Sequence, residues 1–186
     1  MSVQELIAGI RSEDAGTRCA AWQTAGEYGA SAVIPLAAVM GESGVDQEVA
    51  RAAKNGLWAV VRSAWPPGTD AADGSVVSAL IELLKGEQPV AVRREALWML
   101  SEIGGAESVE AIAGLVTNGQ LREDARCALE RIPGEKSLDA LKQAFDAAAE
   151  DFKSNLAQSL RARGETVDGV PCRKLTPVYK TKADGE

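Results

Sequence analysis

The sequence predicts an all-α protein built from about five helical hairpins stacked in a row. The first observation is a repeat: VRREALWMLSEIGG (92–105) recurs 29 residues later as LREDARCALERIPG (121–134), with small and aliphatic residues at the same positions. The second is composition, because 46% hydrophobic residues can fill one continuous core, while 4% aromatic residues suit helix packing by Ala, Leu and Val. Self-similarity at a fixed period is typical of helical repeat arrays.

The same pattern of small and aliphatic residues occurs in residues 14–42, 46–86, 89–117 and 119–146, and more weakly in 149–164. The aligned residues are Ala21, Ala25 and Tyr28; Ala53, Leu57 and Val60; Ala96, Leu100 and Ile103; and Ala125, Leu129 and Ile132. Spacings of four and three residues place each set on one face of a helix. Each copy is therefore expected to begin with an amphipathic first helix that buries this face.

Other local signals place the remaining helices. Residues 2–12 are expected to form a leading helix, because Ser2 and Glu5 make a capping box. A second helix follows the glycine or proline stop of each copy, with Ser31 and Ser75 as the expected N-caps in copies one and two. Residues 1–164 are thus expected to form one solenoid domain.

The last repeat and the C-terminus depart from the pattern. In 149–164, Arg163 replaces the third apolar residue, and the polar outer face suits a capping repeat. Residues 165–186 lack sustained periodicity and are expected to form an extended or disordered tail. The tail carries a basic run of Arg173, Lys174, Lys180 and Lys182. Two alternatives are open for it: a tail that lies over the acidic body or stays in solvent, or a peptide that a partner recognises.

The first-helix pattern V/L-R-x-x-A-x-x-x-L-x-x-I-G, followed by a second helix of aliphatic residues, resembles HEAT repeats over about residues 14–164. In length it is similar to the HEAT-like subunits of phycobilin lyases. The resemblance implies a right-handed α-α superhelix, with the second helices on its concave side, that serves as an interaction surface. It also implies that Asp and Arg residues near the starts of first helices form a ladder between adjacent repeats. These residues are Asp14, Asp46, Arg18, Arg93 and Arg122.

Charge argues against nucleic acid as a partner. The net charge of −7 is carried by residues 1–164, because basic and acidic residues balance in 165–186. Binding to a phosphate backbone needs many cationic contacts. The sequence also contains no run of about 18 apolar residues and no basic-then-apolar leader. We therefore expect a cytoplasmic protein that does not contact membranes and is a monomer or weak homo-oligomer.

Residues that carry chemistry are scarce. The chain has no histidine, so Ser-His-Asp, Cys-His and His-ligated metal sites are excluded. Cys19, Cys127 and Cys172 lack metal-ligand spacing, and Cys19 and Cys127 belong to distant repeats, too far apart for a disulfide. The sequence predicts no catalytic residue, no cofactor and no metal.

The candidate partner-binding residues fall into two groups. Trp65, Pro66 and Pro67 belong to AWPPGTDAADG (64–74), a long helix-breaking segment between the two helices of copy two. Trp65 is expected to be either a binding anchor or a plug over the gap left where Val61 replaces the glycine stop. The other group lies on the second helices and comprises Glu82, Glu110, Asp139 and Gln143. The other tryptophans, Trp22, Trp58 and Trp98, are expected to pack in the core or between repeats.

These observations favour a non-catalytic protein–protein interaction or scaffold module whose partner is another protein or peptide. The alternative is an accessory subunit of a lyase or chaperone-like cofactor-attachment system, as the resemblance to phycobilin lyase HEAT subunits implies. A visible chromophore on the purified protein, or catalysed attachment of one, would favour the alternative.

Overall fold

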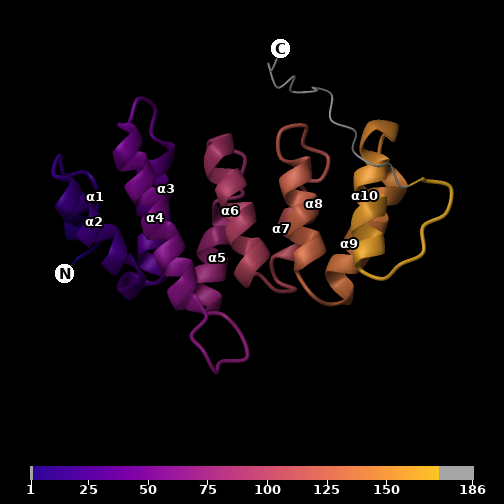
Figure 1. Ribbon diagram of the computed structural model, residues 1–186, viewed down its shortest axis with the longest axis horizontal. Helices are drawn as coiled ribbons and strands as arrows, with labels where there is room; N and C mark the ends of the chain where they lie inside the picture. Colours follow the sequence, from indigo (N-terminus) through magenta and orange to yellow (C-terminus); the bar gives the residue numbers. More distant parts are fainter. Residues whose placement is uncertain (1, 172–186) are drawn as a thin grey trace, which may run out of the picture.

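The computed structural model describes residues 2–171 and shows helical hairpins stacked along one axis (Figure 1). The helices are α1 (Val3–Ile10), α2 (Ala15–Thr24), the 3-10 helix η1 (Ala25–Tyr28), α3 (Ala30–Gly41), α4 (Gln47–Ala64), α5 (Gly74–Glu82), α6 (Val90–Ile103), α7 (Val109–Ala113), α8 (Arg122–Arg131), α9 (Glu135–Ala147) and α10 (Glu150–Ala162). Every regular element in this part of the chain is a helix. The predicted fold class, an all-α solenoid of helical hairpins, is confirmed.

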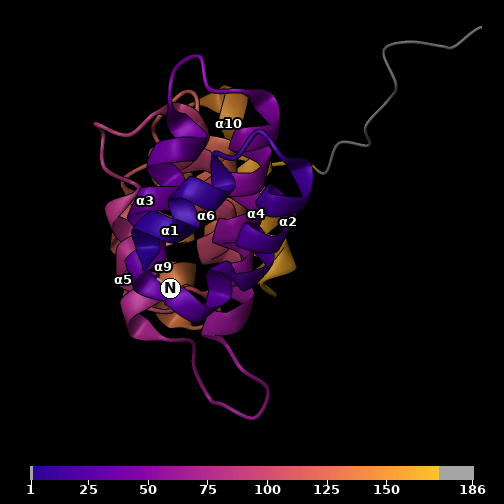
Figure 2. The ribbon, with the colours of Figure 1, turned by 90° about the vertical axis from the view of Figure 1, so that its left-hand side faces the viewer.

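The helices form two layers. The first helices of the repeats, α2, α4, α6, α8 and α10, each contact the next in the series. The second helices, α3, α5, α7 and α9, lie in the other layer, where α1 contacts α3. Figure 2, which views the stack from its N-terminal end, shows α2 and α4 on one side and α3 and α5 on the other. Each of the first four repeats therefore offers one helix to each face of the molecule.

The core lies between these layers and follows the predicted register. The aligned residues buried there are Ala25, Ala53, Leu57, Val60, Ala96, Leu100, Ile103, Ala125, Leu129 and Ile132. Ala21 and Tyr28 are only partly buried, because the first repeat has α1 rather than another full hairpin on its outer side. Burial of one apolar face per helix is what stabilises short helices that would be marginal alone.

The two serine N-caps expected from the sequence are wrong. The N-cap of α3 is Gly29, and the Ser31 hydroxyl donates to the carbonyl of Tyr28 instead. The N-cap of α5 is Asp73, whose carboxylate accepts from the backbone N–H of Ser75 at 2.9 Å. Both helices begin slightly earlier than expected, so each serine falls inside the first turn. The capping box of Ser2 and Glu5 at α1 is confirmed.

Copy two departs from the other copies where the sequence indicated. Without a glycine stop, α4 continues through Val61, which is buried, to Ala64. A loop of residues 65–73 then leads to α5, and the backbone N–H of Asp73 donates to the carbonyl of Ala64 at 2.8 Å. This hydrogen bond closes the loop at its base, so α5 begins beside the end of α4.

The fifth repeat contributes one helix, α10, within the described residues. Gly164, at φ +88°, ends it, and the chain then turns back along α9 and α10. Val167 packs against the core, and the Arg161 guanidinium donates to the Val167 carbonyl at 2.8 Å. Residues 165–171 thus cover part of the last repeat where a second helix would otherwise stand. The basic run predicted at 173–182 lies outside the described residues.

Arg163, the polar residue in an otherwise apolar position, has a structural explanation. In copy three the N–H of Gly104 donates to the Leu100 carbonyl at 2.8 Å. The aligned residue in copy four is Pro133, which has no N–H for the Leu129 carbonyl. Arg163 Nη1 donates to that carbonyl at 3.1 Å and to the Ile132 carbonyl at 2.8 Å. The guanidinium therefore satisfies carbonyls at the end of α8.

Candidate interaction surfaces

Polar contacts join neighbouring first helices. The indole N–H of Trp58 on α4 donates to Glu95 Oε1 on α6 at 2.5 Å, and Lys54 Nζ lies 2.8 Å from Glu95 Oε2. Lys54 and Trp58 are four residues apart, so they share one face of α4. Both side chains therefore hold the same carboxylate of the next repeat.

The junction between α6 and α8 repeats this arrangement with different residues. Arg94 Nε lies 2.9 Å from Asp124 Oδ2, and the indole N–H of Trp98 donates to Asp124 Oδ1 at 3.1 Å. Trp98 keeps 39% of its surface exposed even so. The expectation that Trp58 and Trp98 serve inter-repeat contacts is confirmed. The sequence alignment missed their equivalence, because it placed the two tryptophans in different columns.

The ladder implied by the resemblance exists, but mostly through other residues. Arg122 on α8 belongs to it, since its Nη2 lies 2.7 Å from Asp151 Oδ2 on α10. Arg18 does not, because it donates to the carbonyls of Ser12 and Glu13 just before its own helix. Arg93 reaches the preceding repeat through the backbone carbonyl of Leu84 rather than through an aspartate. Asp14 and Asp46 are N-caps of α2 and α4. The layer of first helices is thus joined mainly through Glu95 and Asp124, which accept from side chains of the preceding first helix.

The loop of residues 65–73 carries an exposed tryptophan. Trp65 keeps 44% of its surface in solvent, so it does not plug the space beside the buried Val61. Its indole N–H donates to the Thr69 carbonyl at 3.1 Å, and the Thr69 hydroxyl donates to the Pro66 carbonyl at 2.8 Å. Figures 1 and 2 both show the loop projecting beyond the ends of α4 and α5. Trp65, Pro66 and Pro67 therefore form the start of an internally hydrogen-bonded loop, with Trp65 directly after the end of α4.

The four predicted residues on the second helices are all exposed. Glu82 ends α5 and is paired with Lys85. Glu110 on α7 and Asp139 on α9 form no ion pair within residues 2–171. Gln143 lies one turn after Asp139 on the same face of α9. The structure brings Glu110, Asp139 and Gln143 to neighbouring helices, whereas Glu82 lies a repeat away.

A groove of about 400 Å³ lies between α7, α9 and the start of α10. Its walls are mainly small and apolar, and it is lined by Ala113, Val116, Thr117, Arg122, Ala140, Gln143, Ala144, Ala147, Ala148, Ala149, Phe152 and Leu156. Arg122 lies over the Phe152 ring, with its guanidinium carbon 4.7 Å from the ring centroid. Of the predicted residues, only Gln143 lines this groove. A signal was present in the alanines at 140, 144 and 147, which recur at helical spacing on α9.

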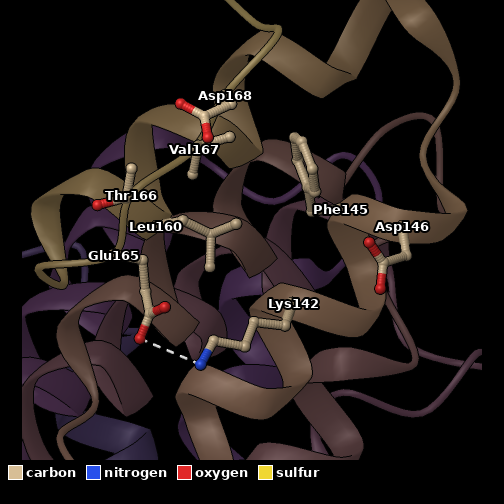
Figure 3. Close-up of a pocket in the computed structure, with 8 residues that line it drawn as sticks. All are labelled: Lys142, Phe145, Asp146, Leu160, Glu165, Thr166, Val167 and Asp168. Atoms are coloured by element: carbon tan, nitrogen blue, oxygen red, sulfur yellow. Dashed lines mark ion pairs between the residues drawn. The ribbon is translucent and has the colours of Figure 1, made fainter.

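A second pocket, of about 350 Å³, lies where residues 165–168 fold over α9 (Figure 3). Lys142 Nζ lies 3.1 Å from Glu165 Oε1, and the ion pair crosses one side of the pocket. Phe145 and Leu160 supply its apolar surface. The only lysine in it is already paired, so the pocket is best explained as the space left by the folded-back segment.

The remaining chemistry of the described residues is limited. Cys19 and Cys127 are free thiols, as expected, and Cys172 lies outside the described residues. Burial raises the pKa of the Cys127 thiol, which lowers the fraction of reactive thiolate. Within residues 2–171, no group of three or more Cys, Asp or Glu side chains is arranged to hold a metal ion. In the same part of the chain, no helix combines the length and apolarity needed to cross a membrane.

Comparison with known proteins gives a family match over part of the chain and a similar solved structure. Residues 77–161 match the family model of HEAT repeats. Among solved structures, the chain is similar to the crystal structure of an engineered protein, a Northeast Structural Genomics Consortium target. The two share 20% sequence identity, with 86% of this chain and 78% of that chain covered and a TM-score of 0.43. No curated protein matches the chain.

Proposed function

We propose that this chain, in which residues 77–161 are HEAT repeats, is a non-catalytic module that binds another protein or peptide. HEAT repeats generally mediate protein–protein interaction or scaffolding. The chain would act in the cytoplasm as a monomer or weak homo-oligomer. The alternative role in cofactor attachment rests only on a resemblance to lyase subunits.

The observation that carries the proposal is the exposed Trp65 on a preordered loop. The structure leaves 44% of this side chain in solvent, where a partner can contact it. Tryptophan is enriched at binding hot spots. Pro66, Pro67 and the hydrogen bonds to Thr69 restrict the loop before a partner arrives, which lowers the entropy lost on binding.

The test begins with recovery of partners from the native host on the immobilised protein, followed by mass spectrometry. The affinity of each purified partner is then measured for wild type, Trp65→Ala and Trp98→Ala. We expect Trp65→Ala to lose about 2 kcal/mol of binding free energy with little change in melting temperature. Trp98 is the matched control, because it is similarly exposed but bonded to Asp124 of the next repeat. Its replacement should lower stability more than affinity.

Two results would count against the proposal. If Trp65→Ala binds every recovered partner with wild-type affinity, the loop is not the interface. If the purified protein carries a chromophore or attaches one to a substrate protein, the cofactor-attachment alternative replaces the scaffold function.

A further inference from the structure

The groove between α7, α9 and α10 is shaped to accept apolar side chains. Its floor and walls are alanines, with Val116, Phe152 and Leu156, and its volume of about 400 Å³ is in the range of small-ligand pockets. Small residues along α9 let another chain approach closely. Ala140, Ala144 and Ala147 share one stripe of that helix, so the groove runs along its length.

The cations around the groove are already engaged. Arg122 pairs with Asp151 and stacks over Phe152. Lys136 Nζ donates to the Ala106 carbonyl at 2.8 Å, and Lys142 pairs with Glu165. An acidic partner would therefore find few free cations at this surface.

Unpaired carboxylates stand beside the same groove. Glu110 lies one turn before Ala113, which lines the groove from α7. Asp139 is adjacent to Ala140 and one turn before Gln143, both of which line it from α9. Neither carboxylate forms an ion pair within the described residues. An apolar groove with free negative charge at its side is complementary to a basic segment with apolar side chains.

We propose that this groove is a second binding site, which takes a basic amphipathic segment of a partner protein. One or two large apolar side chains of the segment enter between α7 and α9, and its Lys or Arg side chains pair with Glu110 and Asp139. The site is separate from the Trp65 loop, which joins α4 to α5 and projects below them, whereas α7, α9 and α10 lie further toward the C-terminal end of the stack (Figure 1). The two sites can therefore be tested independently.

The probe is a fluorescein-labelled peptide of about 14 residues, long enough for a short helix. Leu residues occupy one face of that helix and Lys residues the opposite face. Binding to the full chain is followed by fluorescence anisotropy. We expect saturable binding that weakens as salt rises, since screening reduces attraction between exposed charges. A Glu/Leu peptide of the same pattern and a Lys/Ser peptide should each bind at least about tenfold more weakly, a difference of about 1.4 kcal/mol.

Two sets of variants locate the site. Glu110→Lys with Asp139→Lys should weaken Lys/Leu peptide binding at least about tenfold, and Ala144→Phe should weaken it similarly by filling the groove. The control is Glu13→Lys with Glu27→Lys, which changes net charge equally at the opposite end of the array. Both controls are exposed and have no ion pair in the described residues. This control and Trp65→Ala should keep nearly wild-type affinity for the peptide. All of these variants should keep the melting temperature of the wild type.

Three outcomes would overturn the proposal. The first is a control variant that weakens binding as much as the groove variants, since the attraction would then be general. The second is equal binding of the Glu/Leu peptide. The third is a wild-type chain that does not bind the peptide, together with a variant that does bind it once Arg173, Lys174, Lys180 and Lys182 are replaced by Ser. The chain's own tail would then be the occupant of the groove.

Discussion

Replacing Arg163 by Met isolates one arginine that joins the last repeat to the one before it. The guanidinium donates to the carbonyls of Leu129 at 3.1 Å, Ile132 at 2.8 Å and Gly134 at 3.0 Å. Met keeps an apolar stem of similar length but removes the charged donor. The carbonyls of Ile132 and Gly134 still accept from the Ser137 hydroxyl, whereas the Leu129 carbonyl loses its side-chain donor. Pro133 prevents a backbone N–H from replacing it at Leu129.

The expected cost follows from these contacts. Hydrogen bonds from a charged donor contribute about 1.5–3 kcal/mol, and a buried acceptor left unpaired adds a penalty of its own. The Leu129 and Ile132 bonds are partly buried, while the Gly134 bond is exposed and adds little. We therefore expect Arg163→Met to lower the free energy of unfolding by about 2–3 kcal/mol. In a chain of this length that corresponds to a fall of about 5–10 °C in melting temperature.

The matched control is Arg131→Met. Arg131 Nη2 lies 2.6 Å from Glu102 Oε1, but both side chains are nearly half exposed. Such surface pairs contribute at most about 1 kcal/mol. Urea unfolding followed by circular dichroism compares the two variants, and hydrogen exchange shows whether amides of α10 lose protection first, as nearest-neighbour coupling of repeats predicts. If Arg163→Met is no more destabilising than Arg131→Met, the role assigned to Arg163 is wrong.

Two further predictions concern stability. Gly26→Ala should lower the free energy of unfolding by about 1–3 kcal/mol, because a Cβ there would lie 2.1 Å from Ser63 Oγ. Gly74→Ala should leave stability nearly unchanged, because no atom lies within 4 Å of a Cβ at that position. Equal losses of stability in the two variants, measured by calorimetry, would refute the packing argument. Stability should also fall in acid, since hydrogen bonds from Thr17 lower the pKa of Asp14 and those from Ser75 lower the pKa of Asp73, from an ordinary value of 3.8. A depressed folded-state pKa contributes stability above the unfolded value and loses it as pH falls through the folded value. Melting temperature should therefore decline below about pH 4, and less steeply in Asp14→Asn with Asp73→Asn; an identical decline would contradict the assignment.

The sequence by itself determined the fold and much of the core. Spacings of four and three residues place Ala53, Leu57 and Val60 on one face, and that face must be buried whatever packs against it. The capping box of Ser2 and Glu5 correctly placed the start of α1, whereas the N-caps of α3 and α5 differ from those expected. The interruption of the repeat pattern after Val61 could also be read from the sequence, because the missing glycine stop and the two prolines are local features.

Only the tertiary structure decided which side chains meet across repeats. The hydrogen-bond partners of Trp58 and Trp98 lie 37 and 26 residues away along the chain. Which side chain each indole meets depends on the rotation of one hairpin against the next. The same holds for Arg163, whose guanidinium donates to the Leu129 carbonyl that Pro133 leaves without a backbone N–H. It also holds for the groove, which exists only where α7, α9 and α10 come together. Local spacing determines which face of a helix is apolar, but the relative placement of helices determines what that face and its edges contact.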